Sequence, residues 1–157
     1  MKQSESIAKL AAALVKVQPL LQHPKKNAKN PHLRNKFADL GSVIDANRVL
    51  LADHGLVVIQ GTAWDCDLAH QSGVHQVGVC TRLAHESGEW IEQLCCIPLE
   101  EQKGINLAQA AGSIITYLRR YGWQTILGLN GEPDDDGNEG SGSGSPTSTP
   151  RDTDDLL

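Results

Sequence analysis

Two neighbouring arginines, Arg119 and Arg120, stand in a stretch of sequence that carries no acid to pair with them. The stretch reads QAAGSIITYLRRYG, from Gln109 to Gly122, and no Asp or Glu occurs anywhere from Gln102 to Gly131. At helical spacing it has one polar row, made of Gln109, Ser113, Thr116 and Arg120, with Arg119 at its border. A solvent-facing helix usually mixes Glu with Lys or Arg for i,i+4 pairing. This row is therefore rich in hydrogen-bond donors, and its positive charge has no local partner.

A second basic feature lies nearer the N-terminus. From Lys16 to Arg48 there are seven bases against two acids, and those between residues 25 and 36 are Lys25, Lys26, Lys29, Arg34 and Lys36. Arg and Lys, together with Gln, Ser and Thr, are common donors to phosphate oxygens in nucleic-acid complexes. Contacts of this kind predict binding that depends on salt and little on base sequence. For the individual lysines, a solvated charged loop is an equal alternative.

Aromatic side chains are scarce in this chain, with three Trp, two Tyr and one Phe. Tyr121 falls in the apolar arc of the predicted helix and is expected in the core, whereas Tyr117 lies at the edge of that arc. A groove that binds single strands mainly by stacking needs more rings than this. We therefore expect phosphate contact to outweigh base stacking.

Other chemistries have weaker support in the sequence. The six histidines and four cysteines form no CxxC, HxxxH or HxH pattern, so no metal site is expected. No GxxxxGK[ST] loop is present for a nucleotide. The candidates for a hydrolytic triad, His85, Glu86, Ser87 and Glu89, lie within one turn where neighbouring side chains diverge. We expect neither a cofactor nor enzymatic activity.

The formal charge of −5 is unevenly distributed. Residues 132–157 carry eight acids against Arg151, a charge of −7, which leaves +2 for residues 1–131. This last segment is rich in Gly, Ser and Pro and has almost no apolar residues, so it is predicted to be a disordered acidic tail. The prediction is one domain, residues 1–131, followed by the tail.

The sequence has no apolar stretch that approaches the ~20 residues needed to span a bilayer. Its N-terminus also lacks a basic region followed by a long apolar run. We therefore expect a cytoplasmic protein that does not bind membranes and whose four cysteines are reduced.

The elements that must position these residues follow from hydrophobic spacing. Helices are predicted over Ser4–Val17, with Ser4 or Ser6 as N-cap, over Leu40–Asp53, and over the arginine-bearing stretch. Strands are predicted over Leu56–Thr62, Val74–Ala84 and Trp90–Ile97, joined by short loops. In the second strand one side carries Val77, Val79, Thr81 and Leu83. The fold class is α+β, an antiparallel meander of about three strands packed by helices.

Several stretches of the chain resemble the Erf-type single-strand annealing proteins of temperate phages. They are NPHLRNKFADLGSVIDA, LLADHGLVVIQ, TRLAHESGEWIE, AQAAGSIITYLRRYG and EPDDDG, and together they cover about Ser4 to Gly137. The most specific part is the GSxxTYxRRY block, from Gly112 to Tyr121. A K-[YF]-A-x-L segment supports it, with Phe37 where tyrosine is common.

This resemblance implies a β-β-β-α core like that of the eukaryotic Rad-type annealing proteins. It further implies a homo-oligomer, a ring or a helical filament, that carries single-stranded DNA in a basic groove. Such a protein pairs complementary strands without ATP during phage homologous recombination. The alternative is a mediator that coats or loads single strands without annealing them.

The residues predicted to bind DNA combine the polar row, the basic segment and the positions that the resemblance carries over. They are Lys25, Lys26, Lys29, Arg34, Lys36, Lys103, Gln109, Ser113, Thr116, Tyr117, Arg119 and Arg120. The expected partners are single-stranded DNA and the annealed duplex intermediate. For the acidic tail three roles stay open: a competitor for the groove, a docking segment for a host single-strand-binding protein or recombinase, and a solubilising linker.

Overall fold

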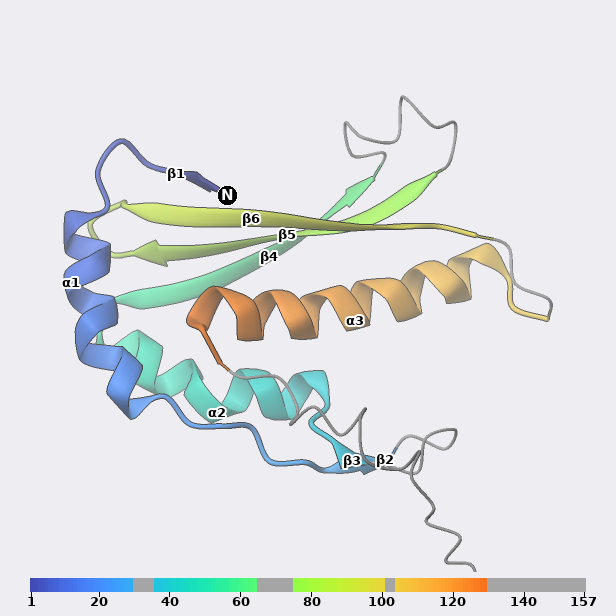
Figure 1. Ribbon diagram of the computed structural model, residues 1–157, viewed down its shortest axis with the longest axis horizontal. Helices are drawn as coiled ribbons and strands as arrows, with labels where there is room; N and C mark the ends of the chain where they lie inside the picture. Colours follow the sequence, from blue (N-terminus) through green and yellow to red (C-terminus); the bar gives the residue numbers. More distant parts are fainter. Residues whose placement is uncertain (30–35, 65–74, 101–103, 130–157) are drawn as a thin grey trace, which may run out of the picture.

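The computed structural model describes residues 1–29, 36–64, 75–100 and 104–129. Figure 1 shows a sheet of long strands with helices on one side of it. In chain order the elements are β1 (Lys2–Gln3), α1 (Ala8–Val17), the 3-10 turn η1 (Gln18–Leu20), β2 (Ala28–Lys29), β3 (Lys36–Phe37), α2 (Leu40–Asp53), β4 (Leu56–Trp64), β5 (Gln76–His85), β6 (Trp90–Pro98) and α3 (Leu107–Leu127).

The main sheet is antiparallel, in the order β1-β6-β5-β4. Its three long strands are consecutive in the chain, so they form the predicted meander, and the α+β fold class is confirmed. The two outer strands differ in length. β4 is a full-length edge, whereas β1 pairs with β6 only at Ile91 and Glu92. β2 and β3 pair separately, as a two-residue ladder.

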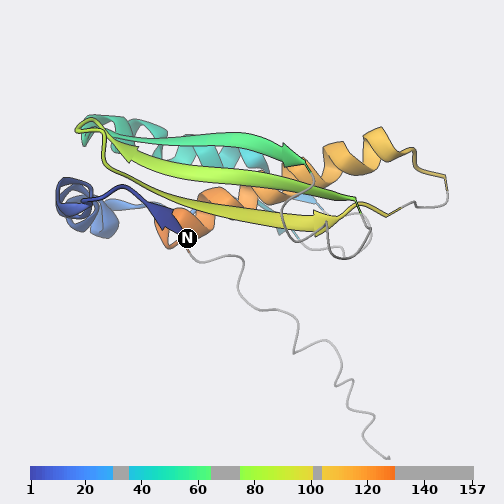
Figure 2. The same cartoon turned by 90° about the horizontal axis from the view of Figure 1, so that it is seen from above.

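Helices α2 and α3 pack on one face of the sheet, and α1 lies at one end. Seen from above, the opposite face of the sheet is turned toward the viewer and carries no helix of the described chain (Figure 2). The side of β5 that faces the helices holds the predicted alternating set: Val77, Val79, Thr81 and Leu83 are all at most 1% exposed. The apolar sides of the helices pack against these side chains.

Local signals fix the ends of α2 and α3. The Asp39 carboxylate accepts a hydrogen bond from the Ser42 N–H at 2.8 Å and caps the start of α2. Asn106 and Gln109 form a capping box at the start of α3. Each helix ends next to a glycine with φ of 68°, Gly55 and Gly128, a conformation that other residues rarely adopt.

The N-terminal helix differs from its prediction. It begins at Ala8 instead of Ser4, because residues 2–3 pair with β6 and the Ser4 N–H donates to the Trp90 carbonyl at 2.9 Å. A serine N-cap was therefore wrong: the N-cap is Ile7, without a side-chain cap. The Glu89 carboxylate, from the β5–β6 turn, instead accepts from the Lys9 and Leu10 N–H groups at 2.7 and 2.9 Å.

The other predicted elements keep their type: α2 has the predicted bounds, and β4, β5, β6 and α3 differ in length. The short elements η1, β2 and β3 were not predicted. The last helix is longer than the predicted stretch at both ends, and β4 continues to Trp64. Cys80 and Cys95 are free thiols, as expected, but Cys96 is disulfide-bonded, so the expectation of four reduced cysteines was wrong. The predicted acidic tail lies outside the described residues.

Candidate nucleic-acid interface

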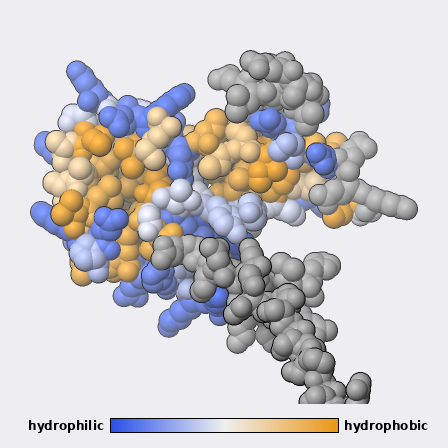
Figure 3. All heavy atoms as spheres, viewed as in Figure 1, coloured by the Kyte–Doolittle hydropathy of each residue, from blue (hydrophilic) through white to orange (hydrophobic). Residues whose placement is uncertain are grey.

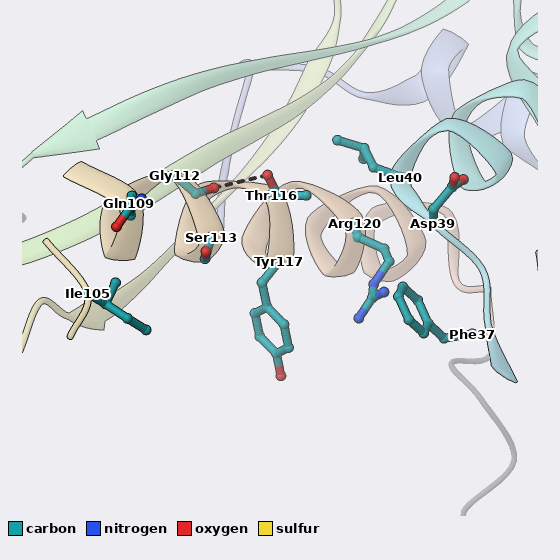
Figure 4. Close-up of a pocket in the computed structure, with 10 residues that line it drawn as sticks. All are labelled: Phe37, Asp39, Leu40, Ile105, Gln109, Gly112, Ser113, Thr116, Tyr117 and Arg120. Carbon is teal, nitrogen blue, oxygen red and sulfur yellow. Dashed lines mark hydrogen bonds between the residues drawn. The ribbon is translucent and has the colours of Figure 1, made fainter. Parts of the chain in front are cut away.

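The polar row of α3 lines a groove of about 880 Å³ between this helix and the segment that leads into α2 (Figure 4). We call it the α3 groove. Its lining residues are Phe37, Asp39, Leu40, Ile105, Gln109, Gly112, Ser113, Thr116, Tyr117 and Arg120. The structure therefore brings together five of the residues predicted to bind DNA, all from one face of one helix.

Two members of the row already have hydrogen-bond partners within α3. The Thr116 hydroxyl donates to the Gly112 carbonyl at 3.0 Å, and the Gln109 side chain accepts from the Asn106 N–H at 3.3 Å. The Ser113 hydroxyl makes no hydrogen bond to any other described residue. Within this face of α3, the groups left for a ligand are thus mainly the Gln109 amide N–H groups, the Ser113 hydroxyl and the Arg120 guanidinium.

Arg120 lies among aromatic rings. Its guanidinium carbon is 4.8 Å from the centroid of the Phe37 ring, 5.2 Å from that of Tyr121 and 5.9 Å from that of Tyr117. One N–H group reaches the Ala38 carbonyl at 3.4 Å, a weak contact. Figure 4 shows the Arg120 and Tyr117 side chains pointing to the same side of α3 as the Phe37 ring.

Asp39 is the acid that lines the same groove as Arg120, but the two form no ion pair. The pKa of Asp39 is lowered chiefly by the Ser42 N–H, then by Asn27, with only a small contribution from the charge of Arg120. In the described chain the ion pairs of arginine are Arg48–Asp45 and Arg82–Glu92. The charge of Arg120 is therefore not neutralised by a carboxylate of the described residues.

Arg119 points elsewhere, toward the sheet. Its Nε donates to the Gln60 side-chain oxygen at 3.3 Å, and the Gln60 amide nitrogen donates to the Arg119 carbonyl at 2.8 Å and to the Thr81 hydroxyl at 3.0 Å. The structure therefore separates the two arginines. Arg120 lines the α3 groove, whereas Arg119 contacts β4 through a neutral amide.

A glycine brings α3 close to the sheet next to this contact. A Cβ atom at Gly122 would overlap the Thr81 hydroxyl oxygen, so only glycine allows this approach. The Gly122 carbonyl also accepts from the Gln93 side chain at 3.1 Å. These contacts fix the position of α3, and with it the positions of the groove side chains.

Tyr121 was expected in the core, and that prediction was wrong. It is 40% exposed, Tyr117 is 47% exposed, and their ring centroids are 4.3 Å apart at an interplanar angle of 42°. Loss of solvent raises the pKa of Tyr117, and the Tyr121 side chain adds to this shift. The core position is instead taken by Leu118 and Trp123, which are buried.

The basic segment is only partly described. Lys25 and Lys26 are exposed and lie outside the lining of the α3 groove. Lys29 and Lys36 belong to the β2–β3 ladder, and Lys36 directly precedes the groove residue Phe37. Arg34 and Lys103 lie outside the described residues.

Sequence reasoning missed several residues that form the α3 groove. Asp39 and Leu40 begin α2, Ile105 precedes α3, and Gly112 leaves an open space on the helix surface, with no atom within 4 Å of where its Cβ would stand. Phe37 and Leu40 had a signal in the K-[YF]-A-x-L segment, and Gly112 had one in the GSxxTYxRRY block, whereas Asp39 and Ile105 had none. All of them come together because α3 packs beside the start of α2.

We also looked among the described residues for a metal site, a hydrolytic triad and a membrane-spanning helix. In the described part of the chain, no three His, Cys, Asp or Glu side chains are arranged to hold a metal ion. His85 Nδ1 and the Ser87 hydroxyl are 2.8 Å apart within the β5–β6 turn, a contact that closes the turn. No helix among the described residues has both the length and the apolar character of a membrane span.

Comparison with known families agrees with the motifs around this groove. The family model described as the ERF superfamily matches residues 10–155. A search of curated proteins found no significant match. The matched range includes every element that lines the α3 groove, from Phe37 to Arg120. The chain therefore belongs to the ERF superfamily, a family of DNA-binding proteins linked to single-strand annealing in phage recombination.

Proposed function

We propose that this protein binds single-stranded DNA and anneals complementary strands without ATP, as a homo-oligomer in phage homologous recombination. The observation that carries the proposal is the α3 groove, where the partly exposed Arg120 has no ion-pair partner among the described residues. Family membership supports the same function. The phosphates of a DNA strand would supply the negative charge that pairs with Arg120, which no described carboxylate does.

The electrostatics of the groove suit a strand held along a composite surface. Arg120 and Asp39 are its charged lining residues, so its own formal charge is balanced. Lys25 and Lys26, exposed on the segment that precedes β2, are further positive charges of the described chain. Binding to such a surface releases counterions and falls as salt rises.

Two strand edges support assembly into an oligomer. β4 is an edge along its whole length and exposes Val57 and Ile59, while β6 beyond Glu92 has no further strand beside it in the described chain. Next to this part of β6 is a second hollow of about 340 Å³, lined mostly by apolar residues: Ile97, Pro98, Glu100, Ile105, Ala110, Ser113 and Ile114. Figure 3 shows apolar surface on this side, where the far end of β6 meets the first half of α3.

Pairing β4 of one copy with β6 of the next would join two different surfaces. Such a contact repeats head to tail, so it generates a ring or a helical filament. Long unprotected edges otherwise promote aggregation. In a ring or filament, many α3 grooves act on one strand, and their weak contacts add through effective concentration.

The deciding experiment mixes complementary oligonucleotides, one labelled with a fluorophore and the other with a quencher, without nucleotide or metal. We expect the protein to accelerate pairing. Arg120→Ala should weaken binding to single strands and reduce the salt dependence of log Kd by about 0.7 for each phosphate that the variant no longer neutralises. Circular dichroism should show that the variant stays folded.

The same assay distinguishes the alternatives. Tight binding without acceleration supports a mediator that coats or loads strands. Absence of binding overturns both functions.

Activity in the host cytoplasm and a host partner of the acidic tail remain predictions, and deletion of residues 132–157 tests the tail. A groove competitor predicts tighter binding at low salt after the deletion, and a linker predicts no change.

A further inference from the structure

The rings around Arg120 are arranged as a stacking surface. Phe37, Tyr117 and Tyr121 come from two separate segments and surround one guanidinium group. Tyr117 and Tyr121 keep nearly half of their surface in water. Aromatic faces and arginine planes are the two surfaces on which proteins stack unpaired bases.

A second arginine on the same molecule shows what a purely structural arginine–ring contact looks like. On the helix-free face of the sheet, Arg82 lies 4.2 Å over the Trp90 ring. Its Nε and Nη2 both contact the Glu92 carboxylate, at 2.8 and 2.6 Å. That arginine is satisfied within the fold. Arg120 has comparable ring contacts but only a weak hydrogen bond to the Ala38 carbonyl.

The polar lining offers fewer free donors than the sequence suggested. The Thr116 hydroxyl is engaged within α3, Arg119 points to the sheet, and Arg120 is the one cation among the lining residues. A site built to hold phosphate alone would present several free donors and an excess of positive charge. The rings of Phe37 and Tyr117 in the lining add a surface that phosphate contact alone does not need.

The open surface at Gly112 gives a ligand close access. Its missing side chain leaves free space beside Ser113 and Thr116, on the same wall of the groove as Tyr117. A volume of about 880 Å³ lies within the range of sites that enclose small ligands, ~300–1,000 Å³. The groove is thus large enough to take a nucleotide beside Tyr117.

From these observations we infer that the α3 groove is a base-stacking subsite, which takes an unpaired nucleobase against Tyr117 and the Arg120–Phe37 pair. The inference rests on the proposed function, because it assigns the ligand class of the same groove. A base inside a duplex is paired and stacked on both faces, so it cannot enter. The subsite thus favours strands that are still unpaired and releases them once pairing is complete.

The test compares two ligands with the full chain. One is an oligothymidine, and the other is a sugar–phosphate strand of the same length and charge without bases. At one salt concentration we expect the oligothymidine to bind about tenfold more tightly, the usual effect of one stacked base. A strand with 2-aminopurine should also show a change in fluorescence when the base enters the ring cluster.

Two variants separate stacking from phosphate contact. Tyr117→Leu should abolish the preference for bases while leaving the salt dependence unchanged, and it should fold because Tyr117 is exposed. Arg120→Lys keeps the charge but removes the planar group, so it should keep the salt dependence and abolish most of the preference. The matched control is Trp90→Leu, which removes the ring from the Arg82 contact on the helix-free face and should keep the preference.

The inference and the proposed function fail in different ways. Equal binding of both strands by the unmodified protein overturns the stacking subsite, while salt-dependent binding and annealing would still support the proposed function. A base preference that Tyr117→Leu leaves intact also overturns the assignment to this groove. Failure to bind either strand overturns both.

Discussion

Arg119 and Arg120 are neighbours in sequence, but their side chains face different surroundings. Arg119 is held against β4 by the Gln60 amide, and Arg120 lies between rings at the opening of a groove. Consecutive helical residues diverge by about 100°, so this separation follows from the helix itself. The two arginines therefore differ in their surroundings: Arg119 contacts the sheet, and we propose that Arg120 contacts the ligand.

Gly112 predicts a conflict between stability and binding. Glycine inside a helix costs about 1 kcal/mol relative to alanine, and a Cβ here would touch nothing within 4 Å. Gly112→Ala should therefore raise the melting temperature by a few degrees. It should also weaken binding of single-stranded DNA, because the methyl group takes up space where the ligand approaches the helix.

The control for this prediction is Gly122→Ala, on the same helix. A Cβ there overlaps the Thr81 hydroxyl, so the melting temperature should fall. Calorimetry and fluorescence anisotropy measure the two effects. If Gly112→Ala left the affinity for DNA unchanged, the ligand would not approach α3 at this position.

At the scale of elements, α1 depends on a residue far from it in sequence. The Glu89 carboxylate accepts from two N–H groups at the start of α1, and these contacts lower the pKa of Glu89, the Leu10 N–H most of all. A carboxyl group whose pKa is lower in the folded state stabilises the fold at pH above its unfolded value. This stabilisation disappears as pH falls from the ordinary value of 4.5 through the lower folded value.

Glu89→Gln should therefore lower the melting temperature at neutral pH, and the difference from the unmodified protein should shrink as the solution is acidified below about 4.5. Thermal melts across this pH range measure it. The control is Glu5→Gln, which changes an exposed carboxylate on the segment that precedes α1. A difference that stays constant with pH would show that the charge of Glu89 does not cap the helix.

The elements also show which parts of the fold can be predicted from sequence. The bounds of α2 and the buried side of β5 were predictable, because caps and alternation depend on residues close in the chain. The start of α1 was not, since its cap comes from the β5–β6 turn. Tyr121 has the spacing of a core residue, yet it contacts Arg120, and this choice depends on where α2 and Phe37 lie.

At the scale of the whole molecule, the two open strand edges lead to a test of assembly. Ile59 is 55% exposed on the edge strand β4, on the helix-free face. Ile59→Lys should lower the native mass to that of one protomer, because a charge on an edge strand opposes pairing with another chain. Annealing should fall with it, while circular dichroism should stay unchanged.

The matched control places the same charge away from the sheet. Val15→Lys, on the outer side of α1, changes a residue that is 73% exposed and should leave the native mass unchanged. Native mass spectrometry, with and without an oligonucleotide, measures the outcome. If the Ile59→Lys protein kept its mass, the copies would associate through another surface.

The opposite orientations of Arg119 and Arg120 also bear on how such a sequence can change over time. One turn of α3 serves the contact with β4 on one side and the groove on the other, and Gly122 holds it at a fixed distance from β5. A substitution that rotated or lifted this helix would disturb both neighbourhoods together. Amino-acid substitutions in this turn of α3 are therefore restricted to those that keep the rotation of the helix. A change on the side facing β4 would be compensated by a change on the side facing the α3 groove.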